Sequence, residues 1–307
     1  MSQEPSPAVL ALASAYPHDP AHLHSVIIPQ IAHRLRLTTL WSIAPSSRVL
    51  DIGCGQGDSA LVLSHAVAPA AADGPTSAPG HVTALDPAPG DYGSPYTLAQ
   101  AQAHILASEP YGARISFHQA DAPSYVAAHP TETFDSATLC HSLWYFSSAA
   151  ALSSLFSALH SSGRIKRLCF AEYCIKASRP AQVPHELAVE AQRRFHELRE
   201  DRGFTLQQAN VRGAVDPESL IRLAEEAGWT LREKGTVDTP GMLDGRWEVA
   251  AVLDPSWAEE VAGERLGKEA EEELLGFVAR IKAVTDELKE KGSKVETMDA
   301  TWVVMER

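Results

Sequence analysis

Three glycines closely follow Asp51 in one short stretch of the chain, "RVLDIGCGQGD", from Arg48 to Asp58. Glycine weakens strand and helix interiors, so such a cluster marks backbone that adopts positive φ or approaches a ligand closely. The apolar run before it predicts a buried strand, and the residues after it predict a helix. A strand, a glycine turn and a helix together indicate a ligand-binding unit.

The spacing of the glycines separates two classes of ligand. A dinucleotide pyrophosphate favours G-x-G-x-x-G, in which the third glycine allows close helix–strand packing. Here Gly53, Gly55 and Gly57 form G-x-G-x-G, preceded by Asp51 within the strand. This pattern resembles the first motif, D/E-x-G-x-G-x-G, of the class I S-adenosylmethionine-dependent methyltransferases. The resemblance implies S-adenosyl-L-methionine as cofactor and S-adenosyl-L-homocysteine as product.

The ends of three later strands carry further residues that match this family. Asp86 lies at the carboxyl end of the strand in "HVTALDP", where an acidic side chain can accept hydrogen bonds from both ribose hydroxyls. Asp121 and Ala122 resemble the family's adenine-contacting pair, and "LCHS" resembles the segment beside the methionine portion of the cofactor. The cofactor-binding residues that the resemblance implies are Asp51, Gly53, Cys54, Gly55, Gly57, Asp86, Pro87, Asp121, Ala122, Cys140 and His141.

The catalytic candidates follow from the chemistry of methyl transfer. The protein must align an acceptor atom with the methyl group and exclude water, and a hydroxyl acceptor benefits from a general base. Trp144 in "HSLWYF" takes the place of the histidine base of plant-type oxygen methyltransferases, which leaves the base open. The candidates are His141, Trp144 and Tyr145 after the fourth strand, and His24 before the N-terminal helix. Structural roles for His141 and the two aromatic residues are the alternatives.

The acceptor is constrained mainly by motifs that are missing. The fourth strand lacks the "NPPY" or "DPPY" of nucleic-acid and protein amide methyltransferases. No acidic residue directly follows Leu139, at the place where catechol-type enzymes hold magnesium. The segment "HDPAHLH" does not have a convincing metal-ligand spacing. We therefore expect metal-independent transfer to an oxygen or nitrogen of a small molecule.

The fold expected from these elements is α/β, with a doubly wound, mostly parallel seven-stranded sheet. Residues 1–45 should form a helical cap, and residues 46–307 a methyltransferase domain with a substrate-lid insert at about 179–213. The small-residue segment 68–80 predicts a mobile loop, and 244–261 favours helix over strand. A long amphipathic helix at 267–292 is expected to pack on the sheet. The strands are expected at 47–53, 81–87, 113–121, 166–174, 230–237 and 299–306, and residues 134–146 are expected to form a strand that runs into a loop.

The composition argues against nucleic-acid binding and membrane spans, and it predicts the cellular compartment. The net charge of −13 and the pI near 5.4 argue against a nucleic-acid surface. No apolar run reaches the ~20 residues of a membrane span, and the N-terminus lacks a basic start, so we expect a cytoplasmic protein. The four cysteines have no metal or redox spacing and are expected to be buried, reduced thiols.

Two alternatives remain open at this point, because the glycine turn alone is a weak signal. One is a nicotinamide-dependent oxidoreductase, although Lys176 stands at the wrong interval from Tyr173 for a Tyr-x3-Lys pair. The other is a non-catalytic regulator that binds S-adenosylmethionine. The identity of the acceptor and the choice between a monomer and a homodimer also stay open.

Overall fold

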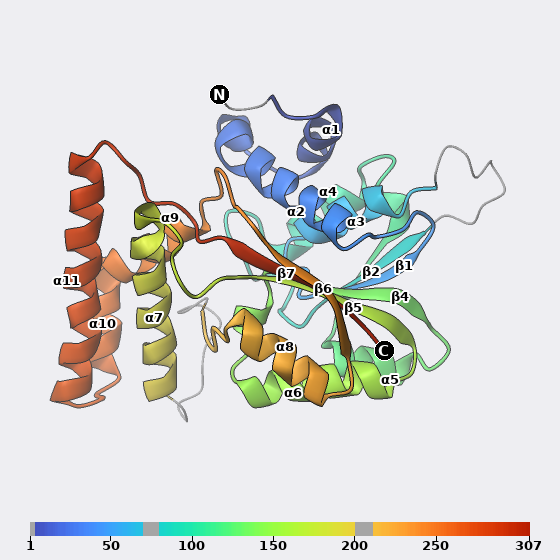
Figure 1. Ribbon diagram of the computed structural model, residues 1–307. Helices are drawn as coiled ribbons and strands as arrows, with labels where there is room; N and C mark the ends of the chain where they lie inside the picture. The colour runs from blue at the N-terminus through green and yellow to red at the C-terminus, as the bar shows by residue number, and fades with distance from the viewer. Residues whose placement is uncertain (1–3, 70–79, 200–210) are drawn as a thin grey trace.

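The computed structural model describes residues 4–69, 80–199 and 211–307. Residues 70–79 of the expected loop and residues 200–210 of the expected insert lie outside the described residues. Within them, the chain folds around one seven-stranded sheet flanked by helices (Figure 1).

The sheet has the strand order β3-β2-β1-β4-β5-β7-β6, which confirms the expected fold class. Strands β1 to β5 run parallel, whereas β7 is antiparallel to both of its neighbours. The order reverses between β1 and β4, and ligands of such sheets bind outside the carboxyl ends at this point. The strands are β1 (Arg48–Ile52), β2 (His81–Asp86), β3 (Ile115–Gln119), β4 (Phe134–Cys140), β5 (Ile165–Tyr173), β6 (Thr230–Val237) and β7 (Ala300–Glu306).

Alternating strand residues supply two hydrophobic cores, one on each face of the sheet. Val49 packs into one core and Leu50 into the other, as the two-residue period of a strand requires. On the second face α5 (Ala122–Ala128), α6 (Ala149–Ser161) and α8 (Pro217–Glu226) cover the sheet (Figure 1).

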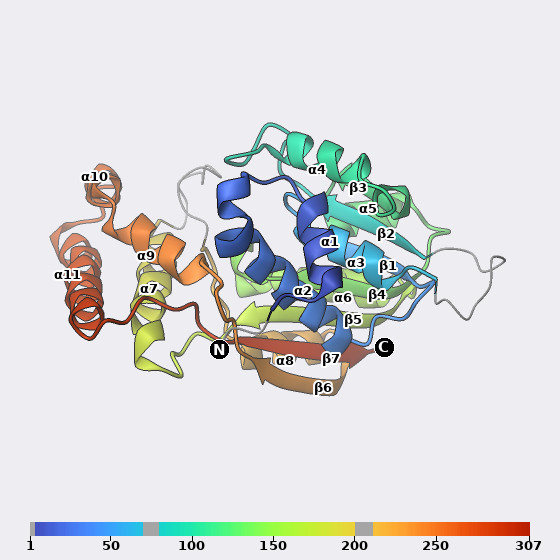
Figure 2. The ribbon, with the colours of Figure 1, turned by 90° about the horizontal axis from the view of Figure 1, so that it is seen from above.

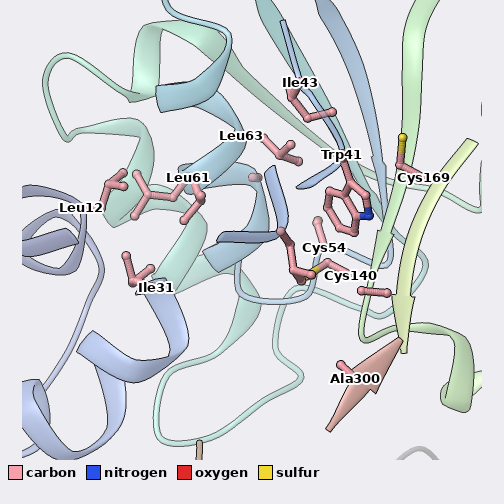
Figure 3. Close-up of a cluster of buried hydrophobic side chains, with 14 of the residues drawn as sticks. Leu12, Ile31, Trp41, Ile43, Cys54, Leu61, Leu63, Cys140, Cys169 and Ala300 are labelled. Carbon is pink, nitrogen blue, oxygen red and sulfur yellow. The ribbon is translucent and has the colours of Figure 1, made fainter. Parts of the chain in front are cut away.

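The N-terminal helices are part of the first core. Helices α1 (Pro7–Ala15) and α2 (Ile28–Leu40) pack together with α3 (Asp58–Ala66), and a short π-helical segment (Leu23–Ile27) leads into α2. Figure 3 shows Leu12 and Ile31 near Leu61, and Trp41 near Cys54 and Cys140. The N-terminal helices are therefore held by the same packing as the sheet.

Four later helices form a separate packing unit beside the sheet. They are α7 (Val183–Leu198), α9 (Asp244–Leu253), α10 (Pro255–Gly263) and α11 (Lys268–Glu290). Phe195, Trp257 and Ile281 belong to their shared core, and Figures 1 and 2 show α11 beside α7, away from the strands. The helical prediction for 244–261 is confirmed, but the expected packing of α11 on the sheet is wrong. Its apolar stripe specifies a buried face without specifying the partner.

Three of the cysteines, Cys54, Cys140 and Cys169, are buried free thiols as expected, whereas Cys174 is only half-buried. No helix among residues 4–69, 80–199 and 211–307 has the length and apolar character needed to span a membrane.

Helix α4 (Leu98–Leu106) begins after a capping box. Thr97 Oγ1 accepts the Gln100 N–H at 3.3 Å, and Gln100 Oε1 accepts the Thr97 N–H at 3.0 Å. From this helix, Gln102 Nε2 donates to the Gly55 carbonyl at 2.9 Å. The cap therefore helps to position the glycine turn.

We expect Thr97→Ala to lower the free energy of unfolding by about 1 kcal/mol in urea denaturation, because the first turn of α4 loses a cap. Thr39→Ala is the matched control, because Thr39 Oγ1 only donates to the Leu35 carbonyl within its own helix. Its expected change is close to zero. Equal losses in the two variants would contradict a capping role.

Candidate functional site

The glycine turn lies between β1 and α3 and is tied to the neighbouring strand. The N–H groups of Gly53 and Cys54 donate to the Leu85 carbonyl at 2.8 and 3.0 Å. Gly53 and Gly57 have φ of +73° and +95°, and a Cβ on them would lie 2.6 Å from Ser142 Cβ and 2.8 Å from the Phe117 ring. These two positions therefore require glycine for both conformation and space.

Asp51 lies beneath this turn and is 1% exposed. Its carboxylate accepts hydrogen bonds from Ser59 Oγ at 2.6 Å and Thr138 Oγ1 at 3.0 Å. Burial raises the pKa of Asp51 to about 6, because desolvation penalises the charged form. Asp51 thus joins β1, α3 and β4 without lining the open space above them.

Asp86 and Asp121 stand at the ends of β2 and β3 and face the open space. Asp86 Oδ2 accepts the Gly55 N–H and Oδ1 accepts the Ala88 N–H, both at 2.9 Å. Asp121 caps α5, and the N–H of Ser124 at 2.9 Å holds the pKa of this exposed carboxyl below its usual value. Carboxylate oxygens have more than one lone pair, so both side chains can still accept hydrogen bonds from a ligand.

This open space, which we call the cleft, has a volume of about 2110 Å³. Typical small-molecule pockets measure about 300–1,000 Å³, so the cleft has room for a cofactor and an acceptor together. On the sheet side it is lined by Gly53, Gly55, Asp86, Pro87, Asp121, Ala122 and Ser142, and on the other sides by residues that include Tyr16, His18, His22, Arg34, Tyr145, Asp244 and Trp247.

The N-terminal segment closes one side of the cleft through direct contacts with the glycine turn. The Tyr16 hydroxyl donates to Gln56 Oε1 at 2.9 Å, and the Gln56 amide donates to the Tyr96 carbonyl at 2.6 Å. Arg34 forms an ion pair with Asp58 at 2.8 Å. Sequence reasoning missed Gln56, although its place between two motif glycines was an available signal.

A smaller cavity of about 60 Å³, which we call the chamber, adjoins the cleft. Arg34, Tyr145 and Asp244 line both spaces. The other residues that line the chamber are His141, Trp144, Glu172, Tyr173, His185, Val211 and Glu248. Sequence reasoning did not find Glu172, Tyr173, Asp244 or Glu248.

His141 faces protein groups in this region. Its Nε2 lies 2.8 Å from His33 Nε2 and its Nδ1 lies 3.5 Å from Glu172 Oε1, while its ring stacks on Tyr173 at 4.2 Å. Glu172 Oε2 also accepts the N–H groups of Leu143 and Trp144 at 2.9 and 3.2 Å. His141 and Glu172 therefore fix the backbone from which the side chains of Trp144 and Tyr145 project.

Some of the predicted site residues line the cleft, some line the chamber, and others line neither. Gly53, Gly55, Asp86, Pro87, Asp121, Ala122 and Tyr145 line the cleft, and His141, Trp144 and Tyr145 line the chamber. In the described part of the chain, Asp51, Cys54, Gly57, Cys140 and His24 line neither space. His24 is exposed on the π-helical segment.

Comparison with known proteins agrees with this geometry. The sequence model of a family described as "Methyltransferase domain" matches residues 49–163. Two curated relatives from Diaporthe leptostromiformis, methyltransferases phomM' and phomM, are each 33% identical over alignments that cover 92% of this chain and 85% of theirs. This chain belongs to the class I S-adenosylmethionine-dependent methyltransferases.

A solved structure supports the same fold for the methyltransferase. A cyclopropane-fatty-acyl-phospholipid synthase-like protein from Lactobacillus casei superimposes with a TM-score of 0.78 at 26% identity, covering 97% of this chain and 98% of the other. Family membership makes S-adenosylmethionine the cofactor and removes the nicotinamide alternative. The crowded glycine turn and the two carboxylates that face the cleft fit a ligand with ribose hydroxyls and an exocyclic amine.

Proposed function

We propose that the methyltransferase transfers a methyl group to an oxygen or nitrogen of a small-molecule acceptor in the cleft, without a metal ion. The observation that carries this proposal is the extent of the cleft beyond the strand ends. It continues from Asp86 and Asp121 to Tyr145 and Trp247, two large aromatic side chains that are 51% and 49% exposed. Exposed aromatic rings beside a cofactor site are suited to cover an acceptor.

In this proposal the residues at the strand ends bind the cofactor, which supplies an electrophilic methyl group on a positively charged sulfonium. Asp86 accepts hydrogen bonds from the ribose hydroxyls, and Asp121 accepts one from the exocyclic amine of adenine. Gly53 and Gly55 let the backbone approach the ligand. Tyr16 and the N-terminal helices exclude water from the reacting atoms. His141 acts as a positioning residue for the aromatic pair beside it.

The proposal extends to the surroundings of the site. Residues 1–45 act as a cap, and the insert at 179–213 acts as a lid that brings His185 to the chamber. Metal independence is supported by the side chains themselves, since no group of three His, Cys, Asp or Glu in the described ranges is placed to hold an ion. The charge of −13 disfavours nucleic acid as a partner. We place the enzyme in the cytoplasm, as a monomer or homodimer.

The cofactor is tested by calorimetric titration with S-adenosylmethionine, S-adenosylhomocysteine and NADH. We expect Asp86→Ala to weaken S-adenosylhomocysteine binding about 30-fold, because two hydrogen bonds to a charged group are lost and the turn loses its anchor at Gly55. Asp91→Ala removes the same charge elsewhere on the cleft, and its expected change is below threefold. Equal weakening in both variants would assign the effect to charge alone.

Turnover is tested with methyl-labelled S-adenosylmethionine and a panel of phenols, alcohols and amines, with and without EDTA. The proposal expects labelled product from at least one class, at a rate that EDTA does not change. Loss of product in EDTA, restored by added magnesium, would refute metal independence. Tight cofactor binding with no product from any small molecule would favour the non-catalytic regulator.

A further inference from the structure

The chamber collects buried hydrogen-bond donors that have no protein partner. Of the buried polar atoms without a hydrogen-bond partner in the described chain, five belong to residues that line the chamber. Arg34 Nε and His141 Nδ1 belong to groups that also contact Asp58 and Glu172, and the other three are the Tyr173 hydroxyl, His185 Nε2 and Trp144 Nε1. Their residues are 5%, 0% and 4% exposed, and all three line the same 60 Å³ space. Buried polar groups are nearly always paired, and one left unpaired destabilises a protein by about 1–3 kcal/mol. Three of them around one cavity indicate that an oxygen atom of a bound molecule accepts hydrogen bonds there.

His185 is fixed as a donor by its other ring nitrogen. The Met298 N–H donates to His185 Nδ1 at 2.9 Å, so the proton of the neutral ring is on Nε2. Burial lowers the pKa of His185 to about 4, which keeps the ring neutral at physiological pH. Its Nε2–H therefore faces the chamber as a donor without a positive charge.

Carboxylates line the chamber as well. Glu172 is occupied by the backbone N–H groups of Leu143, Trp144 and Tyr173. Asp244 accepts from Gln30 Nε2 at 2.8 Å and Glu248 accepts from Gln192 Nε2, which leaves lone pairs on both carboxylates.

The ionisation and pairing of two further groups, Arg34 and Glu248, decide the net charge around the chamber. Arg34 is already paired with Asp58. Burial raises the pKa of Glu248 to about 7. The chamber therefore offers three uncharged donors and one guanidinium N–H, Arg34 Nε, whose charge is balanced by Asp58, together with carboxylate acceptors.

These groups discriminate between the possible ligand groups. An ammonium has no lone pair for the three donors, and a carboxylate would lie against Asp244 and Glu248, while the charge of Arg34 is already paired with Asp58. A hydroxyl accepts from up to two of the donors and donates its own proton to a carboxylate. We propose that the chamber binds an uncharged hydroxyl group of the methyl acceptor, an inference that rests on the proposed function. Because Arg34, Tyr145 and Asp244 line both spaces, the rest of that acceptor lies in the cleft.

The indole N–H of Trp144 gives a direct test by NMR. Protein labelled with ¹⁵N at the tryptophan indoles is saturated with S-adenosylhomocysteine and titrated with 2-phenylethanol, 2-phenylethylamine or phenylacetate. The Trp144 signal is identified by its loss in Trp144→Phe. We expect the alcohol to shift this signal downfield and to bind at least tenfold more tightly than the amine or the carboxylate.

Tyr173→Phe removes one donor and keeps the ring that stacks on His141. We expect it to weaken binding of 2-phenylethanol about fivefold. Tyr111→Phe is the matched control, because Tyr111 is also buried but lines neither the chamber nor the cleft, and its expected change is below twofold. Urea denaturation of both variants checks that each one is folded.

The outcomes separate this inference from the proposed function. Failure of S-adenosylhomocysteine to bind the unmodified protein overturns the proposed function. If S-adenosylhomocysteine binds but the alcohol leaves the Trp144 signal unchanged, the chamber holds only water and the hydroxyl site is overturned. Tighter binding of the amine or the carboxylate overturns it too, as does equal binding of the alcohol to Tyr173→Phe.

Discussion

Replacing Gly53 by alanine should lower the free energy of unfolding by about 4 kcal/mol, whereas the same change at Gly55 should lower it by about 1 kcal/mol. Both residues have positive φ, +73° and +51°, so an alanine adds similar backbone strain at either position. The difference comes from space. A Cβ on Gly53 would lie 2.6 Å from Ser142 Cβ, and nothing lies within 4 Å of one on Gly55.

Ser142 cannot move aside easily, because its hydroxyl donates to the Ile52 carbonyl at 2.9 Å and its residue is buried. The collision must therefore shift the glycine turn against the end of β4. Urea denaturation followed by circular dichroism measures the two losses, with Gly55→Ala as the matched control. Similar losses in both variants would show that backbone strain alone, and not contact with Ser142, makes Gly53 necessary.

The sheet and the cofactor side of the cleft were predictable because their signals are local. Each strand is a short apolar run, and the residues at its carboxyl end are adjacent in the sequence. Parallel strands place those ends at one edge of the sheet, so Gly53, Asp86 and Asp121 could be brought together without knowing any long-range contact. The antiparallel β7 fitted the same pattern, because strand periodicity does not depend on direction.

The chamber was not predictable in the same way, because its residues come from six separate segments. Trp144 follows β4, Tyr173 ends β5, His185 lies on α7, and Glu248 lies on α9, while Arg34 lies on α2 and Val211 precedes α8. Their meeting depends on how the helical unit packs against the sheet, which amphipathic patterns do not specify. One signal was available: Glu172 is an acidic residue at the end of a buried strand, and such a group requires hydrogen-bond donors around it.

Asp51→Asn should raise the free energy of unfolding at pH 7 by up to about 3 kcal/mol, since one pKa unit corresponds to ~1.36 kcal/mol. The pKa of Asp51 is about 6 in the folded protein, against a reference value of 3.8. The folded state therefore holds the proton more tightly. The stability that this provides is fully present below pH 3.8 and is lost as the pH rises through 6. Asparagine has no charge to desolvate and avoids that loss.

Urea denaturation at pH 4, 5, 6 and 7 measures the effect. The gain in Asp51→Asn should be largest at pH 7 and close to zero at pH 4. Asp121→Asn is a control of opposite sign, because the Ser124 N–H lowers the pKa of Asp121 and the ionised cap stabilises α5. A gain in Asp51→Asn that is the same at every pH would point to packing or hydrogen bonding, and not to ionisation.

A buried carboxylate that destabilises the protein at pH 7 requires a compensating role in function. Asp51 lies directly beneath the glycine turn and is mostly ionised at that pH, since its pKa is about 6. A negative charge there favours a positively charged ligand over a neutral one of the same shape. S-adenosylmethionine and S-adenosylhomocysteine differ in the methyl group and in the charge on sulfur. We therefore expect Asp51→Asn to weaken binding of S-adenosylmethionine more than that of S-adenosylhomocysteine, and equal weakening would limit Asp51 to holding Ser59 and Thr138.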